Sequence, residues 1–303
     1  MTRWMVTEPM VLPALNLHWL GFPIPEWWHN VENDPKFQLY ANYGLAGAYG
    51  LIAAVALVQL ARIQLRVPEY GWTTQKVFHL LNCLVCLLRG GVLVFRPQLD
   101  NINPTALKVA LLDLPGLLFF TTYTLLVLFW AEIYHQARSM PTGSLRPVFI
   151  GINLAVYCVQ AGFWALSTMA STEELQQLGY VLSDIFLAAV SVSAAVGFLL
   201  YGSRLFLMLQ RFPIESRGRR KKLHEVGLVT SICAGCFSIR AIIVALCAFD
   251  RENLELDVLS HPLLNVLYYT LVEIVPSACV LYILRKLPPK RTNQQGYQQI
   301  PSS

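Results

Sequence analysis

Seven apolar stretches, each about as long as a bilayer is thick, constrain this chain more than any other feature of its sequence. A helix needs about 20 mostly apolar residues to cross about 30 Å of hydrocarbon, and residues 147–172 contain no charged side chain at all. Because hydrocarbon cannot hydrogen-bond an exposed backbone, such stretches are expected to be helices. The sequence therefore predicts an all-α, polytopic membrane protein, a bundle of seven transmembrane helices. We place the spans near residues 38–62, 73–96, 105–134, 146–169, 177–205, 226–249 and 262–285.

The spans divide the chain into three parts. Residues 1–37 precede them, and their apolar piece is interrupted by prolines, unlike a secretory signal. The tryptophans of this segment favour a place at the lumenal membrane interface. Residues 38–288 form the seven-helix domain, and residues 289–303 are a polar, Gln-rich cytosolic tail that we expect to be disordered.

The distribution of basic residues predicts the orientation of the bundle. Of the 23 Lys and Arg residues, 16 lie in the loops after spans 1, 3 and 5 and in the C-terminal segment. Five lie on the opposite side, and two lie inside spans. Because Lys and Arg accumulate on the cytosolic side of membrane proteins, we expect a cytosolic C-terminus and a lumenal N-terminus.

Charged residues inside the spans are the candidate buried charge pairs. Each unpaired charge costs about 2.5–3.5 kcal/mol or more at the centre of the bilayer, so partners are expected. Depth along the spans suggests that Arg89 pairs with Asp113 and that Arg240 pairs with Glu273. One interpretation is a set of interhelical salt bridges that specify packing, and the other is a polar cavity for a small ligand, an ion or a proton. The candidates are Arg89, Asp113, Asp184, Arg240 and Glu273.

Two of these carboxylates lie close to prolines, Pro115 and Pro276. Each proline removes a helix hydrogen bond and tends to kink its span.

No catalytic, metal or cofactor site is expected. All seven cysteines fall within spans, where a buried cysteine behaves as a small apolar residue. The chain has neither an H-E-x-x-H nor a G-x-S-x-G sequence. The last span contains no lysine that could bind retinal, and the motifs D-R-Y and N-P-x-x-Y of common receptors are missing from spans 3 and 7.

The strongest feature on the predicted cytosolic side is a run of bases at residues 217–222. A simple topology signal would explain such a run. Each base near the membrane also attracts anionic lipid by about 1 kcal/mol, and the run could equally bind an acidic protein surface. The candidate contact or anionic-lipid patch consists of Arg211, Arg217, Arg219, Arg220, Lys221 and Lys222.

Five strings identify a resemblance to a known family. They are RVPEYGWTTQKVFH (66–79), LDLPGLLFF (112–120), LFWAEIYHQAR (128–138), FPIESRGRRKKLHEVG (212–227) and LRKLPPKR (284–291). The chain resembles the plant tobamovirus multiplication protein 1 and 3 family from about residue 38 to 291.

The resemblance implies a seven-pass protein of the vacuolar membrane, the tonoplast, that tobamoviruses recruit as a host factor for viral RNA replication. It implies binding to the helicase part of the viral replication protein, and work with a tetraspanin-like membrane protein and an Arf-like small GTPase. We therefore expect a non-enzymatic membrane scaffold that makes no direct contact with nucleic acid. The alternative is a receptor-like or transporter-like protein with a ligand or ion site among the buried charges.

Overall fold

The computed structural model describes residues 31, 34–66, 73–99, 105–211, 217–249 and 262–285. Most of the predicted N-terminal segment and the whole predicted C-terminal tail lie outside these residues, and so do the tryptophans of the N-terminal segment. The side chains of residues 211–222 and 246–249 also lie outside the described part, although their helical backbone is described for 211, 217–222 and 246–249.

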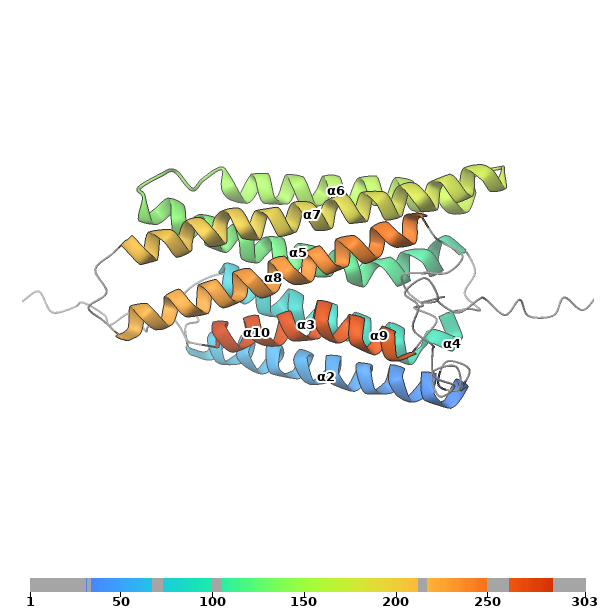
Figure 1. The fold of residues 1–303 in the computed structure, drawn as a ribbon, viewed down its shortest axis with the longest axis horizontal. Coiled ribbons are helices and arrows are strands. Elements are labelled where there is room, and N and C mark those ends of the chain that lie inside the picture. Colours follow the sequence, from blue (N-terminus) through green and yellow to red (C-terminus); the bar gives the residue numbers. More distant parts are fainter. Residues whose placement is uncertain are drawn as a thin grey trace, which may run out of the picture.

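The described residues form helices and no strand (Figure 1). Seven helical segments are long and apolar enough to cross a membrane, which confirms the predicted fold class. The helices are α2 (Pro35–Arg66), α3 (Thr74–Val94), α4 (Arg96–Leu99), α5 (Thr105–Ala137), α6 (Leu145–Met169), α7 (Glu173–Arg211), α8 (Arg217–Phe249), α9 (Pro262–Tyr269), the π-helix η2 (Thr270–Ile274) and α10 (Val275–Leu284). The last three are continuous and together form the seventh span.

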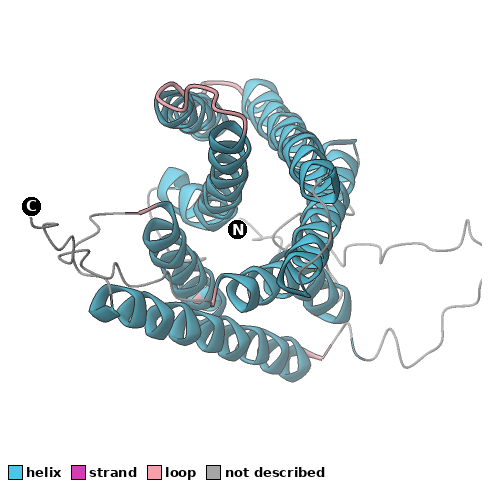
Figure 2. Ribbon diagram, turned by 90° about the vertical axis from the view of Figure 1, so that its left-hand side faces the viewer, coloured by secondary structure: helices cyan, strands magenta, loops and turns pink. Residues whose placement is uncertain are grey.

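The seven spans run up and down along the long axis of the molecule (Figure 1). Helices α2, α5, α7 and α10 finish at the end drawn on the left, where α3, α6 and α8 begin; this is called the basic end below. Helix α5 packs against α3, α6 and α7, while the seventh span packs against α2 and α8. Figure 2 shows the bundle from the basic end.

Several helices extend beyond the predicted spans at the basic end, and α7 and α8 extend furthest. Helix α7 continues to Arg211 instead of ending near residue 205, and α8 begins at Arg217 instead of near residue 226. The bases at 217–222 are thus the first residues of a helix, whereas we expected them in a loop. Hydropathy marks only the part of a helix inside hydrocarbon, and a helix can continue into water because it satisfies its own backbone.

An aromatic cluster joins three of the spans in the core. The ring of Tyr123 on α5 lies 6.1 Å from that of Phe198 on α7 and 5.5 Å from that of Phe237 on α8, measured between centroids. Helices α7 and α8 also approach closely at Gly202, where an added Cβ would collide with the side chain of Thr230. Small residues permit such close helix packing in lipid. The polar contacts of the interior lie between these closely packed helices.

Candidate functional site

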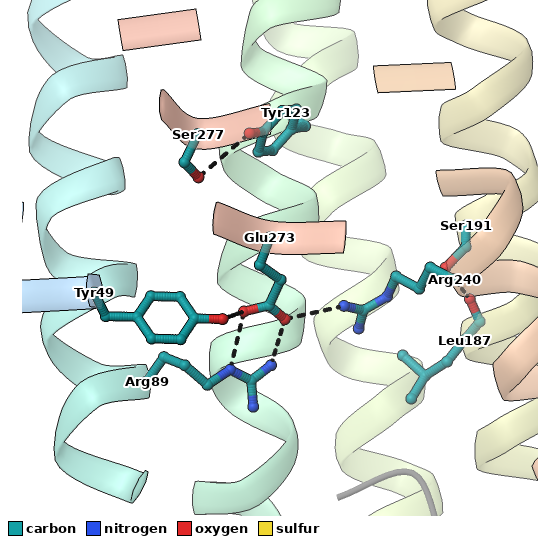
Figure 3. A network of polar contacts seen from close by, with 8 residues as sticks. All are labelled: Tyr49, Arg89, Tyr123, Leu187, Ser191, Arg240, Glu273 and Ser277. Atoms are coloured by element: carbon teal, nitrogen blue, oxygen red, sulfur yellow. Dashed lines mark hydrogen bonds and ion pairs between the residues drawn. The ribbon is translucent and has the colours of Figure 1, made fainter. Parts of the chain in front are cut away.

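Glu273 is the centre of a polar cluster inside the bundle (Figure 3). Its side chain is completely buried. The carboxylate accepts a hydrogen bond of 2.7 Å from the hydroxyl of Tyr49, and two from the guanidinium of Arg89. Three helical segments, α2, α3 and η2, are therefore tied together by one carboxylate.

Arg89 forms a bidentate salt bridge with Glu273. Its Nε lies 3.1 Å from Oε2 and its Nη2 lies 2.7 Å from Oε1. The guanidinium also stacks over the ring of Tyr269, 4.9 Å from the centroid. Paired charge-assisted hydrogen bonds are short and directional, and an aromatic face adds a favourable electrostatic contact. This geometry fixes the rotation of α3 relative to the seventh span.

Arg240 reaches the same carboxylate from α8 (Figure 3). Its Nη1 lies 3.6 Å from Oε1 of Glu273, which is an ion pair but too long for a hydrogen bond. Arg240 forms no hydrogen bond with any other residue in the described part of the chain. A Cβ at Gly116 of α5 would lie 2.5 Å from Nη2 of Arg240, so α5 and the guanidinium approach closely there.

The helix that carries Glu273 is locally widened. Residues Thr270–Ile274 form a π-helical turn, in which the N–H of Val275 bonds to the carbonyl of Thr270. Pro276 has no N–H to bond to the carbonyl of Leu271 in the same pattern, and that carbonyl instead accepts a contact of 3.1 Å from the thiol of Cys236. The loss of a helix hydrogen bond that we expected at Pro276 therefore occurs next to a π-helical turn. Such widened turns often occur at functional sites.

The observed partners differ from the two separate pairs that depth predicted. Arg240 lies next to Glu273, as expected. Arg89 also binds Glu273, however, through two hydrogen bonds, whereas depth had suggested Asp113 as its partner. Depth along a span does not reveal which way a side chain faces, because each residue rotates the direction by about 100°.

Asp113 belongs to a second network across α5, α6 and α7. Its carboxylate accepts a hydrogen bond of 2.7 Å from Nε1 of Trp164 and a longer one of 3.5 Å from Gln160. The amide of Gln160 also donates to the hydroxyl of Ser183 at 2.6 Å. Asp184 follows Ser183 on α7 and is partly buried.

Sequence analysis missed four members of these two networks: Tyr49, Gln160, Trp164 and Ser183. Gln160 offered a usable signal, because an amide in the middle of a span needs hydrogen-bond partners. Tyr49 and Trp164 offered none, since aromatic residues are common in apolar helices.

A third polar contact lies at the basic end. Glu132 of α5 accepts a hydrogen bond of 2.8 Å from Nε of Arg146 on α6 and one of 3.2 Å from the hydroxyl of Thr74 on α3. The side chain of Arg146 is 64% exposed. The basic end also presents other exposed arginines: Arg62, Arg66, Arg138, Arg204 and Arg285.

The candidate cytosolic patch can be located only by its backbone. Arg211 is the last residue of α7, and Arg217, Arg219, Arg220, Lys221 and Lys222 occupy the first two turns of α8. Their side chains lie outside the described part of the chain. Among the described residues, no three His, Cys, Asp or Glu side chains come together in a way that could hold a metal ion.

The fold and the interior define a class: an integral membrane protein of seven helices, with charged residues joined across the bundle. Within this class the chain belongs to the THH1/TOM1/TOM3 family, because the model of the THH1/TOM1/TOM3 domain matches residues 23–300. This confirms the resemblance found in the sequence.

Relatives in two plants match over nearly the whole chain. Tobamovirus multiplication protein 1 of Arabidopsis thaliana is 56% identical over 96% of this chain and 98% of its own length. Tobamovirus multiplication protein 1 of Nicotiana tabacum is 58% identical over 90% of this chain and 93% of its own. Tobamovirus multiplication protein 3 of Arabidopsis thaliana is 56% identical over 90% of this chain and 88% of its own. No solved structure matches the chain.

Proposed function

We propose that this chain is a host factor for tobamovirus multiplication that acts as a non-enzymatic scaffold in the vacuolar membrane. The observation that carries the proposal is the identity of 56% with a tobamovirus multiplication protein over 96% of the chain. An identity of this size over the whole membrane domain favours a shared role, and not only a shared fold.

The basic end is the surface proposed to hold partners, with the N-terminus lumenal and the C-terminus cytosolic. Five bases occupy the first turns of α8, and no acidic residue is present in its first turn. The start of a helix carries a partial positive charge, which adds to the charge of these side chains. A positive potential at the membrane surface attracts anionic lipid headgroups and acidic protein surfaces.

The proposed partners are those that the family resemblance implies. In the proposal, the basic end binds the viral replication protein through its helicase part and so anchors the viral RNA replication complex to the membrane. A tetraspanin-like membrane protein and an Arf-like small GTPase take part in the same assembly. In this proposal the chain does not bind the viral RNA itself.

The buried contacts support a scaffold by giving the bundle a fixed shape. Glu273 is held by Tyr49, Arg89 and Arg240, which come from three other helices. A bundle tied in this way presents its helix ends in constant relative positions, as a docking platform requires.

The test is co-purification of the viral replication protein with tagged chain from plant membranes. The triple variant Arg219→Glu/Arg220→Glu/Lys221→Glu should lose most of the captured replication protein, at least about tenfold, because three contacts of about 1 kcal/mol each become repulsive. The matched control reverses three bases at the opposite end of the bundle, Lys36, Arg96 and Lys108.

Protease protection of tags at both termini shows whether each variant keeps the wild-type topology. Loss of capture in the basic-end variant alone supports the proposal. Equal capture by both variants, correctly inserted and at equal membrane levels, would contradict it.

A further inference from the structure

Arg240 is a buried charge whose hydrogen-bonding capacity is unused by the described residues. The residue is 6% exposed. A guanidinium carries five N–H donors, and buried polar groups in folded proteins are almost always hydrogen-bonded. Among the described residues, the only polar interaction of Arg240 is the 3.6 Å ion pair with Glu273.

Glu273 cannot neutralise Arg240 by itself. Its two oxygens already accept three hydrogen bonds, one from Tyr49 and two from Arg89. The carboxylate carries a single negative charge, and its short, two-pronged bond is with Arg89. Two guanidinium groups therefore share one carboxylate, and Arg240 is the one that is held more loosely.

The side chain of Arg240 is not completely enclosed, since 7% of it is exposed. Several buried side-chain atoms of the described residues are sealed from solvent without a hydrogen-bond partner, and no nitrogen of Arg240 is among them. These nitrogens therefore keep part of that small exposed surface. Gly116 of α5 lies against the guanidinium, since a Cβ there would lie 2.5 Å from Nη2.

Water molecules alone would accept hydrogen bonds from the N–H groups of Arg240, but they would not neutralise its positive charge. An uncompensated charge in the interior of a membrane protein is costly, whereas an anion supplies both the acceptor and the opposite charge. The ligand must be small because the side chain is 7% exposed, and it must be monovalent because one guanidinium is to be neutralised. We infer that Arg240 holds a small monovalent anion, a halide or a short carboxylate, between α5, α8 and η2.

Thermal unfolding of the purified full-length protein in phosphatidylcholine nanodiscs tests this inference. Sodium gluconate keeps the ionic strength constant while chloride or acetate replaces the bulky gluconate. The unfolding temperature should rise saturably by about 2–5 °C. The site prefers the anion, chloride or acetate, that saturates the rise at the lower concentration.

The variant Arg240→Gln should lose this rise, while the matched control Arg204→Gln, at an exposed arginine of α7, should keep it. An equal rise in the Arg240→Gln variant would overturn the inference, and so would the lack of any rise in the wild type.

A second measurement needs no variant. A structure of the wild-type protein in bromide should show an anomalous scattering peak beside the guanidinium of Arg240. A guanidinium surrounded only by water at saturating bromide would refute the site.

Discussion

Two contacts between a carboxylate and an arginine have nearly the same length and very different surroundings. Arg89 lies 2.7 Å from Glu273 in the interior, and Arg146 lies 2.8 Å from Glu132 at the basic end. The interior side chains are 5% and 0% exposed, whereas those at the basic end are 64% and 12% exposed. Bond length alone therefore does not rank the two contacts.

The surrounding medium decides what each contact contributes. Water screens the pair at the basic end, and such pairs contribute about 0–1 kcal/mol. In the interior the desolvation of both charges offsets much of their attraction, so the pair as a whole contributes little net stability. Removing one partner is nevertheless costly, because the other charge is left buried. The comparison predicts a graded series of effects.

Glu273→Gln should have the largest effect. It keeps the shape of the side chain and removes the carboxylate charge that faces both Arg89 and Arg240, which should cost about 3–5 kcal/mol or more. We expect most of the protein to aggregate on detergent extraction, as measured by size-exclusion chromatography. The matched control is Glu132→Gln, and equal yields of folded protein from the two variants would contradict the role given to the buried cluster.

Substitution of the two arginines of the cluster should reduce the stability of the protein by different amounts. Arg89→Gln removes the two-pronged bond and should cost about 3 kcal/mol. Arg240→Gln leaves the bond between Arg89 and Glu273 intact and should cost about 1 kcal/mol. Thermal unfolding of both variants in chloride-free buffer makes the comparison. A larger loss for Arg240→Gln would show that Glu273 depends mainly on α8 instead of α3.

Tyr49→Phe should have an intermediate effect. It removes one hydrogen bond of 2.7 Å to a buried carboxylate and nothing else, which should cost about 1.5–3 kcal/mol. The control is Tyr43→Phe, at an exposed tyrosine of the same helix. If thermal unfolding gave equal midpoints for the two variants, the hydroxyl of Tyr49 would have no part in stabilising the cluster.

Arg146→Ala should have the smallest effect, at most about 1 kcal/mol, because the side chain is mostly exposed. Glu132 keeps its hydrogen bond from Thr74 in this variant. The small effect should disappear at high salt, since mobile ions screen exposed charges. A loss as large as that of Arg89→Gln would remove the distinction between the two regions.

Much of the fold could be predicted from the sequence, although the ends of the spans were less certain. The predicted span 146–169 differs by one residue from α6, whose borders are marked by polar loops. The start of α8 was misplaced by nine residues, because the bases at 217–222 have no hydropathy signal of a helix. The identity of the buried charges was also readable, since hydrocarbon makes every charge in a span conspicuous.

The partners of those charges could not be predicted from the sequence. Arg89 and Asp113 have similar depth in neighbouring spans, yet they bind Glu273 and Trp164 respectively. Similar depth brings two residues to one layer of the bundle and does not orient them toward each other. The π-helical turn at Thr270–Ile274 adds a further rotation that the sequence does not specify.

The sequence by itself determined the number of membrane-spanning segments, the all-α class and the set of buried charges. These properties are local, because each span must be apolar over the thickness of the bilayer and must satisfy its own backbone. Only the tertiary structure decided that Glu273 contacts Tyr49, Arg89 and Arg240. It also decided that Asp113 accepts a hydrogen bond from Trp164. The reason is geometric: partners are chosen by the rotation of each helix about its axis, and packing between helices sets that rotation.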